Sequence, residues 1–193
     1  MMSSLTTKKA IAYTFKDLLK EKPFNKITVN DIACQCNINR QTFYYHFQDI
    51  PDLAEWICID DVDHLIKKKE EYETWEDKFL IVFKIMLEEK IFVENIYHSV
   101  SREVLRTNLY RLVYPIIYDE ITKKSKGKGL REEDKKFITN FYKYAFVSIV
   151  FEWIDKDMYE NPEMIVLKVS HLVTGTIDHA VQSLKETDKS FKI

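Results

Sequence analysis

The segment 28–53, TVNDIACQCNINRQTFYYHFQDIPDL, constrains the fold more than any other part of the chain. Thr28 is a good N-cap residue, and Asp31 three positions later nearly completes a capping box, so a short helix is expected to begin here. Residues 37–39, Asn-Ile-Asn, predict a tight turn, because Asn tolerates turn geometry and can bond its own backbone. A second helix is expected at 40–47, capped by the second Asn. The segment therefore predicts two short helices joined by a tight turn.

The second of these helices has distinct inner and outer faces. Phe43 and Phe47 are four residues apart and are expected to face inward. The outer faces carry guanidinium, amide, hydroxyl and imidazole groups and no acidic group, which suits base edges and phosphates. We expect bases to be read mainly by Arg40 and Gln41, and most other members of the set to contact phosphates. The candidate DNA-binding residues are Thr28, Asn39, Arg40, Gln41, Thr42, Tyr44, Tyr45 and His46.

This segment resembles the helix-turn-helix signature of the TetR family of bacterial transcription regulators. The family pattern is roughly T-hydrophobic-x-D-I-A, then T-hydrophobic-Y-x-H-F and a Leu six residues later. Two positions depart from it: Asn37 replaces the usual turn Gly, and Ile50-Pro51 replaces a Lys that usually opens the next helix and meets a phosphate. The residues that match are Thr28, Asp31, Ile32, Ala33, Thr42, Phe43, Tyr44, His46, Phe47 and Leu53.

The core RQTFYYHF, the small C-terminal domain and the many aromatic residues are also similar to DhaS-type regulators of dihydroxyacetone kinase operons. The resemblance implies a homodimer that binds a palindromic operator in double-stranded DNA. It also implies that a small-molecule effector, or a separate sensor partner protein, controls the DNA affinity.

Composition agrees with an all-α protein. The 193 residues include only three Gly and four Pro, which leaves few turns and favours long helices. No strand pattern or internal repeat is found, and no apolar run approaches the ~20 residues that span a membrane. No signal peptide opens the chain, so a cytoplasmic location is expected. We predict a three-helix helix-turn-helix DNA-binding domain at 1–50 and a C-terminal helical regulatory and dimerisation domain, TetR-like, at 51–193.

Apolar periodicity divides the chain into helices. Pro51 suits the first turn of the fourth helix, which is expected to be the only segment joining the two domains. Pro115 should kink or break the helix that contains it. The expected helices are 6–22, 28–36, 40–47, 51–72, 75–90, 91–107, 108–123, 131–157 and 162–186.

Charge is unevenly distributed along the chain. Residues 1–50 contain seven basic and four acidic side chains, a net charge of +3, so the remainder of this −2 chain carries −5. A basic N-terminal domain attached to an acidic body fits a DNA-binding domain joined to one that does not bind DNA. A mixed, solvated surface would give a similar split.

The last two expected helices have wide apolar faces. Between residues 137 and 154, apolar residues at a spacing of four form two adjacent rows along the expected helix. Together these rows are wider than the ~100° apolar stripe that packing on one neighbour requires. Gly175, in the middle of the final helix, costs roughly 1 kcal/mol relative to Ala, which a close helix–helix approach would offset. These helices form either a dimer bundle, two from each chain, or the centre of a monomer core. The dimer reading assigns Ile149, Trp153, Val169, Leu172, Val173, Ile177 and Val181 to the interface.

Aromatic residues in the C-terminal domain allow two interpretations. They could line an effector pocket between helices, where hydroxyl and imidazole groups would orient a small ligand. They could equally be ordinary core residues, with regulation entering through a partner protein that binds the outer surface. The candidate pocket residues are Trp75, Phe79, Phe83, Tyr97, His98, Tyr118, Tyr142 and Phe146.

Enzymatic and metal-binding functions lack a supporting motif. Cys34 and Cys36 point about 200° apart on a helix and cannot share a metal well. His171 and His179 are eight residues apart, whereas chelation on one helix uses a spacing of four. We therefore expect no catalytic residue, no metal and no cofactor. The main hypothesis is a dimeric TetR-family regulator, and the alternative is a DhaS-like co-activator or interaction module that responds through a separate sensor protein.

Overall fold

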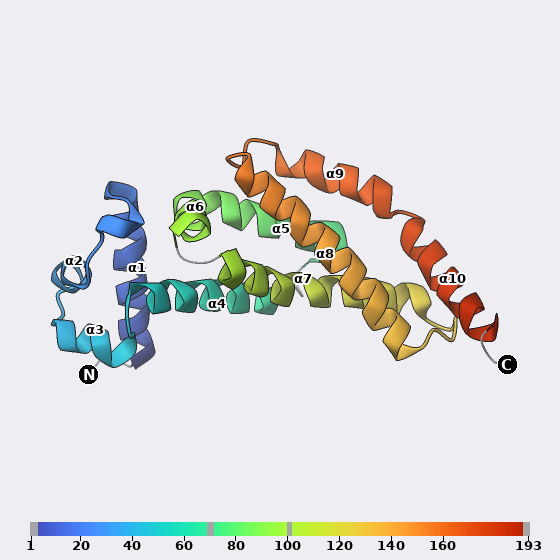
Figure 1. Cartoon of the computed structure of the whole chain (residues 1–193), viewed down its shortest axis with the longest axis horizontal. Helices are drawn as coiled ribbons and strands as arrows, with labels where there is room; N and C mark the ends of the chain where they lie inside the picture. The colour runs from blue at the N-terminus through green and yellow to red at the C-terminus, as the bar shows by residue number, and fades with distance from the viewer. Residues whose placement is uncertain (1–3, 69–71, 100–101, 191–193) are drawn as a thin grey trace. The chain divides into compact units, whose positions relative to one another are not determined.

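The computed structural model describes residues 4–68, 72–99 and 102–190, and every regular element among them is a helix (Figure 1). The predicted all-α class is therefore confirmed. No helix in these ranges is long and apolar enough to cross a membrane. The elements are α1 (Ser4–Glu21), η1 (Phe24–Lys26, a 3-10 helix), α2 (Val29–Gln35), α3 (Arg40–His46), α4 (Ile50–Lys68), α5 (Trp75–Glu88), α6 (Lys90–Ser99), α7 (Arg102–Ser125), α8 (Glu132–Asp155), α9 (Pro162–Val173) and α10 (Thr176–Ser190).

The chain divides into two compact units. The first unit comprises Met1–His64 and Glu89–Asn108, and the second comprises Leu65–Glu88 and Leu109–Ile193. The chain consequently passes between the units at three points: within α4, between α5 and α6, and within α7. The expectation that the fourth helix alone would join the two parts is wrong, because α6 returns to the first unit.

The core of the first unit is built mainly from α1, α3, α4 and α6. Phe15 of α1 is fully buried and meets Phe24 and Phe92 edge to face, with ring centroids 5.7 and 6.5 Å apart. Asn95 of α6 accepts a hydrogen bond from the backbone N–H of Phe24 at 3.3 Å. Residues far along the chain thus complete the core under the N-terminal helices. Its buried members are Ile11, Ala12, Phe15, Leu18, Leu19, Ile27, Ile32, Phe43, Phe47, Leu53, Ala54, Ile57, Cys58, Phe92 and Ile96.

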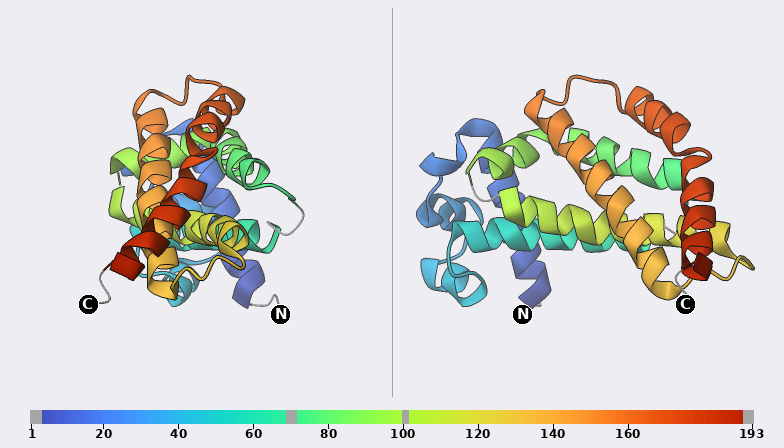
Figure 2. Two further views of the ribbon diagram at one scale, coloured as in Figure 1. Left: turned by 90° about the vertical axis from the view of Figure 1, so that its right-hand side faces the viewer. Right: turned by 45° about the vertical axis from the view of Figure 1, so that its right-hand side comes forward.

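The second unit is held together by a chain of aromatic rings. Phe146 of α8 meets Trp75 at 5.5 Å and Phe79 at 4.4 Å between ring centroids. Phe79 meets Phe83 at 5.1 Å, and Phe83 meets Trp153 at 4.9 Å, each edge to face. Around these rings α5 packs on α9 and α10 packs on α8 (Figure 2).

Helix α7 corrects one expected boundary and is not broken at Pro115. The expected boundary near residue 107 is wrong, because α6 ends at Ser99 and α7 runs unbroken from Arg102 to Ser125 with Pro115 inside it. Pro removes one helical hydrogen bond, at a cost of about 3 kcal/mol or more. Burial of the apolar residues on either side of it offsets this cost. Those residues are Leu112, Val113, Ile116 and Ile117.

The expected final helix is two helices, α9 and α10. Gly175 between them has φ +84°, the left-handed region that favours Gly, and Thr174 N–H closes α9 by donating to the Ser170 carbonyl at 2.8 Å. A Cβ added at Gly175 would meet no atom within 4 Å. Within the part of the single chain that the structure describes, no helix lies close to Gly175, so backbone conformation explains the Gly here. A close approach by a helix of a partner copy stays a prediction.

Substitution of Gly175 tests this explanation. Gly175→Ala should lower the free energy of unfolding by about 1 kcal/mol or more, because left-handed backbone costs an L-residue roughly 1–2 kcal/mol. Gly175→Asn should lower it less, since Asn adopts this conformation more readily. Urea unfolding measures both. If Asn were worse than Ala, side-chain size rather than backbone conformation would decide the position.

Candidate nucleic-acid interface

Helix α2 begins with a complete capping box. The Thr28 hydroxyl oxygen accepts from the Asp31 N–H at 3.2 Å, and the Asp31 carboxylate accepts from the Thr28 N–H at 2.8 Å. The Thr28 hydroxyl also donates to that carboxylate at 2.7 Å, and Lys22 pairs with it at 2.7 Å. Both donors of Thr28 are thus already engaged in the cap.

The turn between α2 and α3 depends on Asn37. Its φ of +53° lies in the left-handed region, which explains how Asn can stand where the family pattern usually has Gly. Asn39 then caps α3, because its side-chain oxygen accepts from the Thr42 N–H at 2.7 Å and from the Thr42 hydroxyl at 3.0 Å. The predicted helix, turn and helix are therefore present.

The inner face of α3 anchors it to the core. Phe43 is fully buried, and Phe47 packs on Phe43 and on Trp56 of α4, at 5.9 and 5.7 Å between ring centroids. The ammonium of Lys8 lies 5.0 Å from the Phe47 ring and 5.4 Å from the Trp56 ring, within range of a cation–π interaction. Lys8 therefore joins α1 to the end of α3, a role with no sequence signal because it depends on residues about 40 positions away.

The outer face of α3 is exposed, and the helix contains no acidic residue. Tyr45 is 81% exposed, Tyr44 is half-exposed, and the Arg40 guanidinium lies 5.9 Å from the Tyr44 ring. Arg40 and Gln41 occupy its first turn and are exposed, as is Asn39, whereas Thr42 and His46 are partly buried. Seven of the eight candidate DNA-binding residues thus lie at the cap or along α3, and Thr28 lies at the start of α2. Their contacts with DNA stay a prediction.

The imidazole of His46 has a pKa below its ordinary value. Burial lowers the pKa of its imidazole, and the nearby Lys8 ammonium lowers the pKa further. Both effects favour the uncharged ring, in which one nitrogen is a donor and the other an acceptor.

The start of α4 explains the second departure from the family pattern. Asp49 and Asp52 form a reciprocal cap: Asp49 accepts from the Asp52 N–H and Asp52 accepts from the Gln48 N–H, both at 2.8 Å. Ile50, where the family usually has Lys, is partly buried against the core of the first unit. This position therefore serves packing.

Two family models match this chain. One, described as "Bacterial regulatory proteins, tetR family", matches residues 16–56, and the other, described as "Transcriptional regulator C-terminal region", matches residues 73–175. The chain belongs to the TetR family. The predicted family is confirmed, and the expectation that the protein is not an enzyme is confirmed by the regulators it matches.

Relatives also support the DhaS-type subgroup. The "HTH-type dhaKLM operon transcriptional activator DhaS" of Lactococcus lactis subsp. lactis (strain IL1403) is 30% identical over 156 residues, 80% of this chain and 82% of that protein. A solved structure of "Dihydroxyacetone kinase operon activator DhaS" is 26% identical, with a TM-score of 0.72 over 90% of this chain and 97% of that one. The fatty acid degradation regulator FadR from Bacillus halodurans, 15% identical with a TM-score of 0.60 over 86% and 93%, shares the fold.

The candidate pocket residues do not all gather in one place. Trp75, Phe79, Phe83 and Phe146 belong to the ring chain of the second unit, whereas Tyr97 and His98 lie on α6 in the first unit. The Tyr118 hydroxyl bonds to Glu132, and the Tyr142 hydroxyl donates to Thr176 at 2.9 Å. A cavity lined partly by Trp75, Tyr142 and Phe146 measures only about 10 Å³. The ligand role of these residues stays a prediction.

The candidate interface residues differ in exposure. Leu172 is 72% exposed and Ile149 is partly buried, whereas the others are buried within the single chain. Trp153 also donates its indole N–H to the Glu160 carbonyl at 2.8 Å, within the connection from α8 to α9. Their role in a dimer likewise stays a prediction. The buried members are Trp153, Val169, Val173, Ile177 and Val181.

An acid titration tests the cap of α2. The pKa of Asp31 is lowered to about 2, first by Lys22 and then by the hydrogen bonds from Thr28. A depressed carboxyl pKa contributes stability above its ordinary value of about 4, and this contribution is lost as the pH falls through about 2. NMR titration should find the Asp31 midpoint near 2. Lys22→Met should raise it, whereas Lys26→Met on η1 should leave it unchanged, and a parent midpoint near 4 would contradict the pairing.

Proposed function

We propose that the protein binds a palindromic operator as a homodimer in the cytoplasm, with α3 of each copy in a DNA major groove. The observation that carries this proposal is the outer face of α3, which is largely exposed, is free of acidic groups and begins at the Asn39–Thr42 cap. In helix-turn-helix proteins the N-terminal residues of the second helix contact base edges. Arg40 and Gln41 occupy those positions here.

The roles of the surrounding residues follow from their chemistry. An Arg guanidinium can donate two hydrogen bonds to one guanine, and a Gln amide can do the same with adenine. The hydroxyls of Tyr44 and Tyr45 and the neutral imidazole of His46 suit phosphate oxygens, which fix the position of the helix without reading sequence. A palindromic site follows from two such helices related by a two-fold axis.

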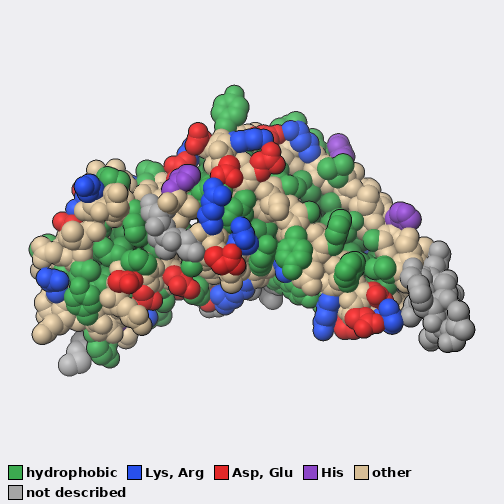
Figure 3. Space-filling model, in the orientation of Figure 1, with side chains coloured by type: hydrophobic (Ala, Val, Ile, Leu, Met, Phe, Trp, Pro, Cys, Tyr) green, Lys and Arg blue, Asp and Glu red, His purple; other side chains and the backbone are tan. Residues whose placement is uncertain are grey.

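The dimer proposal draws on the exposed apolar residues of α8 and α9. Hydrophobic side chains gather over α8 in the face seen in Figure 3. A surface groove of about 200 Å³ between α8 and α9 is lined partly by Ile149, Trp153, Val169 and Leu172, four of the predicted interface residues. Exposed apolar surface of this kind marks an interaction site. The exposed members are Phe137, Phe141, Tyr144, Met164, Leu167 and Leu172.

Control of the DNA affinity has two candidate routes, a small ligand or a separate sensor protein. The packing in the second unit favours the second route, because Trp75, Phe79, Phe83 and Phe146 touch one another and the cavity beside Phe146 measures only about 10 Å³. A surface space of about 320 Å³ beside Trp75 is lined mainly by charged and polar side chains, whereas ligand pockets are mostly apolar. Ligand pockets ordinarily measure about 300–1,000 Å³. The two DhaS proteins named above are operon activators. An interaction module that responds through a partner protein is the alternative that this packing supports.

Two substitutions on α3 should separate base reading from phosphate contact. Arg40→Ala should lose discrimination at one base pair by roughly 1–3 kcal/mol, if the guanidinium binds a guanine through two hydrogen bonds. Tyr44→Phe should weaken binding to every sequence alike, because a phosphate contact carries no sequence information.

The measurement is duplex affinity by fluorescence anisotropy, with an operator selected from random DNA and a scrambled duplex. Tyr159→Phe is the control, since Tyr159 is 92% exposed and lies in the second unit. If all three variants bind both duplexes like the parent, α3 is not the DNA-reading element.

A charge on the exposed face of α8 should disrupt the dimer. Phe141→Glu, at a side chain that is 64% exposed in the single chain, should leave the fold intact and give a monomer, because an unpaired charge would be buried on association. Light scattering measures the mass, and circular dichroism confirms folding. Tyr159→Glu serves as the exposed aromatic control. A dimeric Phe141→Glu protein would place the interface elsewhere.

A further inference from the structure

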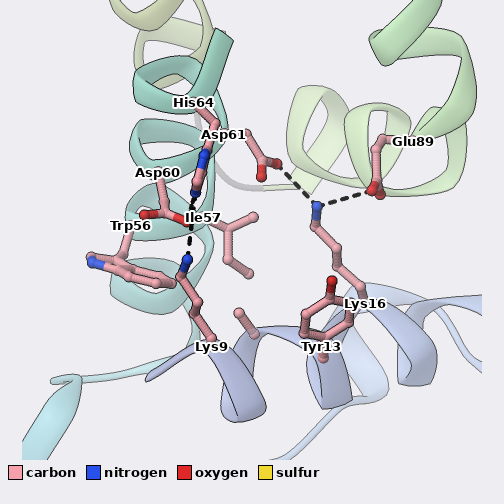
Figure 4. A pocket seen from close by; sticks show the side chains of 10 residues that line it. Lys9, Tyr13, Lys16, Trp56, Ile57, Asp60, Asp61, His64 and Glu89 are labelled. Atoms are coloured by element: carbon pink, nitrogen blue, oxygen red, sulfur yellow. Dashed lines mark hydrogen bonds and ion pairs between the residues drawn. The ribbon is translucent and has the colours of Figure 1, made fainter. Parts of the chain in front are cut away.

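Lys16 of α1 makes an unusual pair of contacts within the first unit. Its ammonium lies 3.0 Å from the Asp61 carboxylate of α4 and 3.1 Å from the Glu89 carboxylate, which directly precedes α6 (Figure 4). It also lies 5.0 Å from the centroid of the Phe92 ring. The Lys16 side chain is only 17% exposed. One cation thus joins three segments that are 45 and 73 residues apart along the chain.

The two carboxylates lie where the chain enters and leaves the first unit. Asp61 is three residues before the point at which α4 passes into the second unit, and Glu89 is the first residue after the chain returns from α5. Lys16 therefore contacts two of the three connections. It belongs to α1, the helix on which α2 and α3 pack.

The paired carboxylates keep the Lys16 ammonium charged. Burial works to lower the pKa of Lys16, but the paired Asp61 and Glu89 outweigh burial and the pKa is raised. Burial raises the pKa of Asp61, and Lys16 offsets only part of that effect. Without Lys16, two partly buried carboxylates would face each other with no cation between them, an arrangement that is strongly unfavourable.

A second contact lies on the same side of α1. Lys9 Nζ is 3.4 Å from His64 Nε2 of α4, and His64 is 3.7 Å from Asp60 (Figure 4). These groups are more exposed than Lys16, so water screens their interaction more strongly. They border an open pocket of about 200 Å³ whose other walls include Tyr13 and Trp56. The ion pairs of Lys16 with Asp61 and Glu89 are therefore the better shielded polar contacts between α1 and the two connections.

We propose that Lys16 is a positioning residue for operator recognition, which holds α1, and with it α3, in a fixed relation to the connections of the first unit. This inference rests on the proposed DNA-binding function. In a dimer the distance between the two α3 helices must match the distance between the two half-sites of the operator. The more rigid the connections are, the more affinity the protein should lose when the half-sites are moved apart. Lys16 touches no DNA in this account and acts through Asp61 and Glu89.

The test is the spacing preference of the full-length protein. Its operator is selected from random duplexes, and a second duplex carries the same half-sites with base pairs inserted at the centre. We define the spacing ratio as the affinity for the selected operator divided by the affinity for the duplex with inserted base pairs. For Lys16→Met, this ratio should fall by at least about fivefold, the lower end of ordinary coupling between sites. Affinity for scrambled DNA should stay unchanged. Lys16→Arg should keep the parent ratio.

Two further variants separate positioning from stability. Lys16→Met combined with Asp61→Asn removes one of the opposed charges, so it should recover resistance to urea without recovering the spacing preference. Glu89→Gln leaves the contact between Lys16 and Asp61 in place, so it should lower the spacing ratio by less than Lys16→Met does. If Lys16→Met alone fails to fold, these two variants decide the matter. Lys20→Met is the matched control, because Lys20 lies one turn further along α1 and pairs with Asp17 at the exposed surface.

The outcomes distinguish the two proposals. Folded Lys16→Met and double variants that keep the parent spacing ratio overturn the role of Lys16 and leave DNA binding intact. A parent that binds its operator but tolerates inserted base pairs also overturns that role. A parent that binds selected and scrambled duplexes equally overturns the DNA-reading proposal itself.

Discussion

The burial of Phe43 and Phe47 is the interaction on which the rest of the first unit depends. Helix α3 has only seven residues, far fewer than the ~12–15 that an isolated helix needs for marginal stability in water. Its geometry must therefore come from the surface on which it packs. That surface consists of α1, α2 and α4, and the core they share with α3 also contains Phe92 and Ile96 of α6. A helix so short thus takes its placement from residues as far away as Ile96, 53 positions beyond Phe43.

The parts of this unit that were predictable from sequence are those governed by local chemistry. Capping by Thr28 and Asn39, the turn at Asn37 and the inward face of Phe43 each depend on residues within four positions of one another. Non-local features were not predictable. No pattern near Lys16 indicates that its partners are Asp61 and Glu89, and no periodicity reveals that α6 belongs to the core beneath α1.

Similar limits apply to the second unit. Aromatic residues at helical spacing are expected both in a pocket and in a packed core, and only the ring-to-ring contacts between Phe79, Phe83 and Phe146 distinguish the two. Pro115 lies inside a continuous helix because the neighbouring side chains are buried, which is again a tertiary effect. Gly175 stands out in the sequence as a Gly within an apolar helical pattern, but its left-handed backbone between α9 and α10 is visible only in the structure.

The salt dependence of operator binding tests the central claim most directly. A helix placed in the major groove by phosphate contacts displaces counterions, so the logarithm of the association constant should fall linearly with the logarithm of salt concentration, with a slope of about −0.9 for each phosphate contacted. The account predicts a steep slope for the full-length protein, and a preference for the selected operator over a scrambled duplex at every salt concentration. A flat salt dependence, or equal affinity for both duplexes throughout, would contradict it.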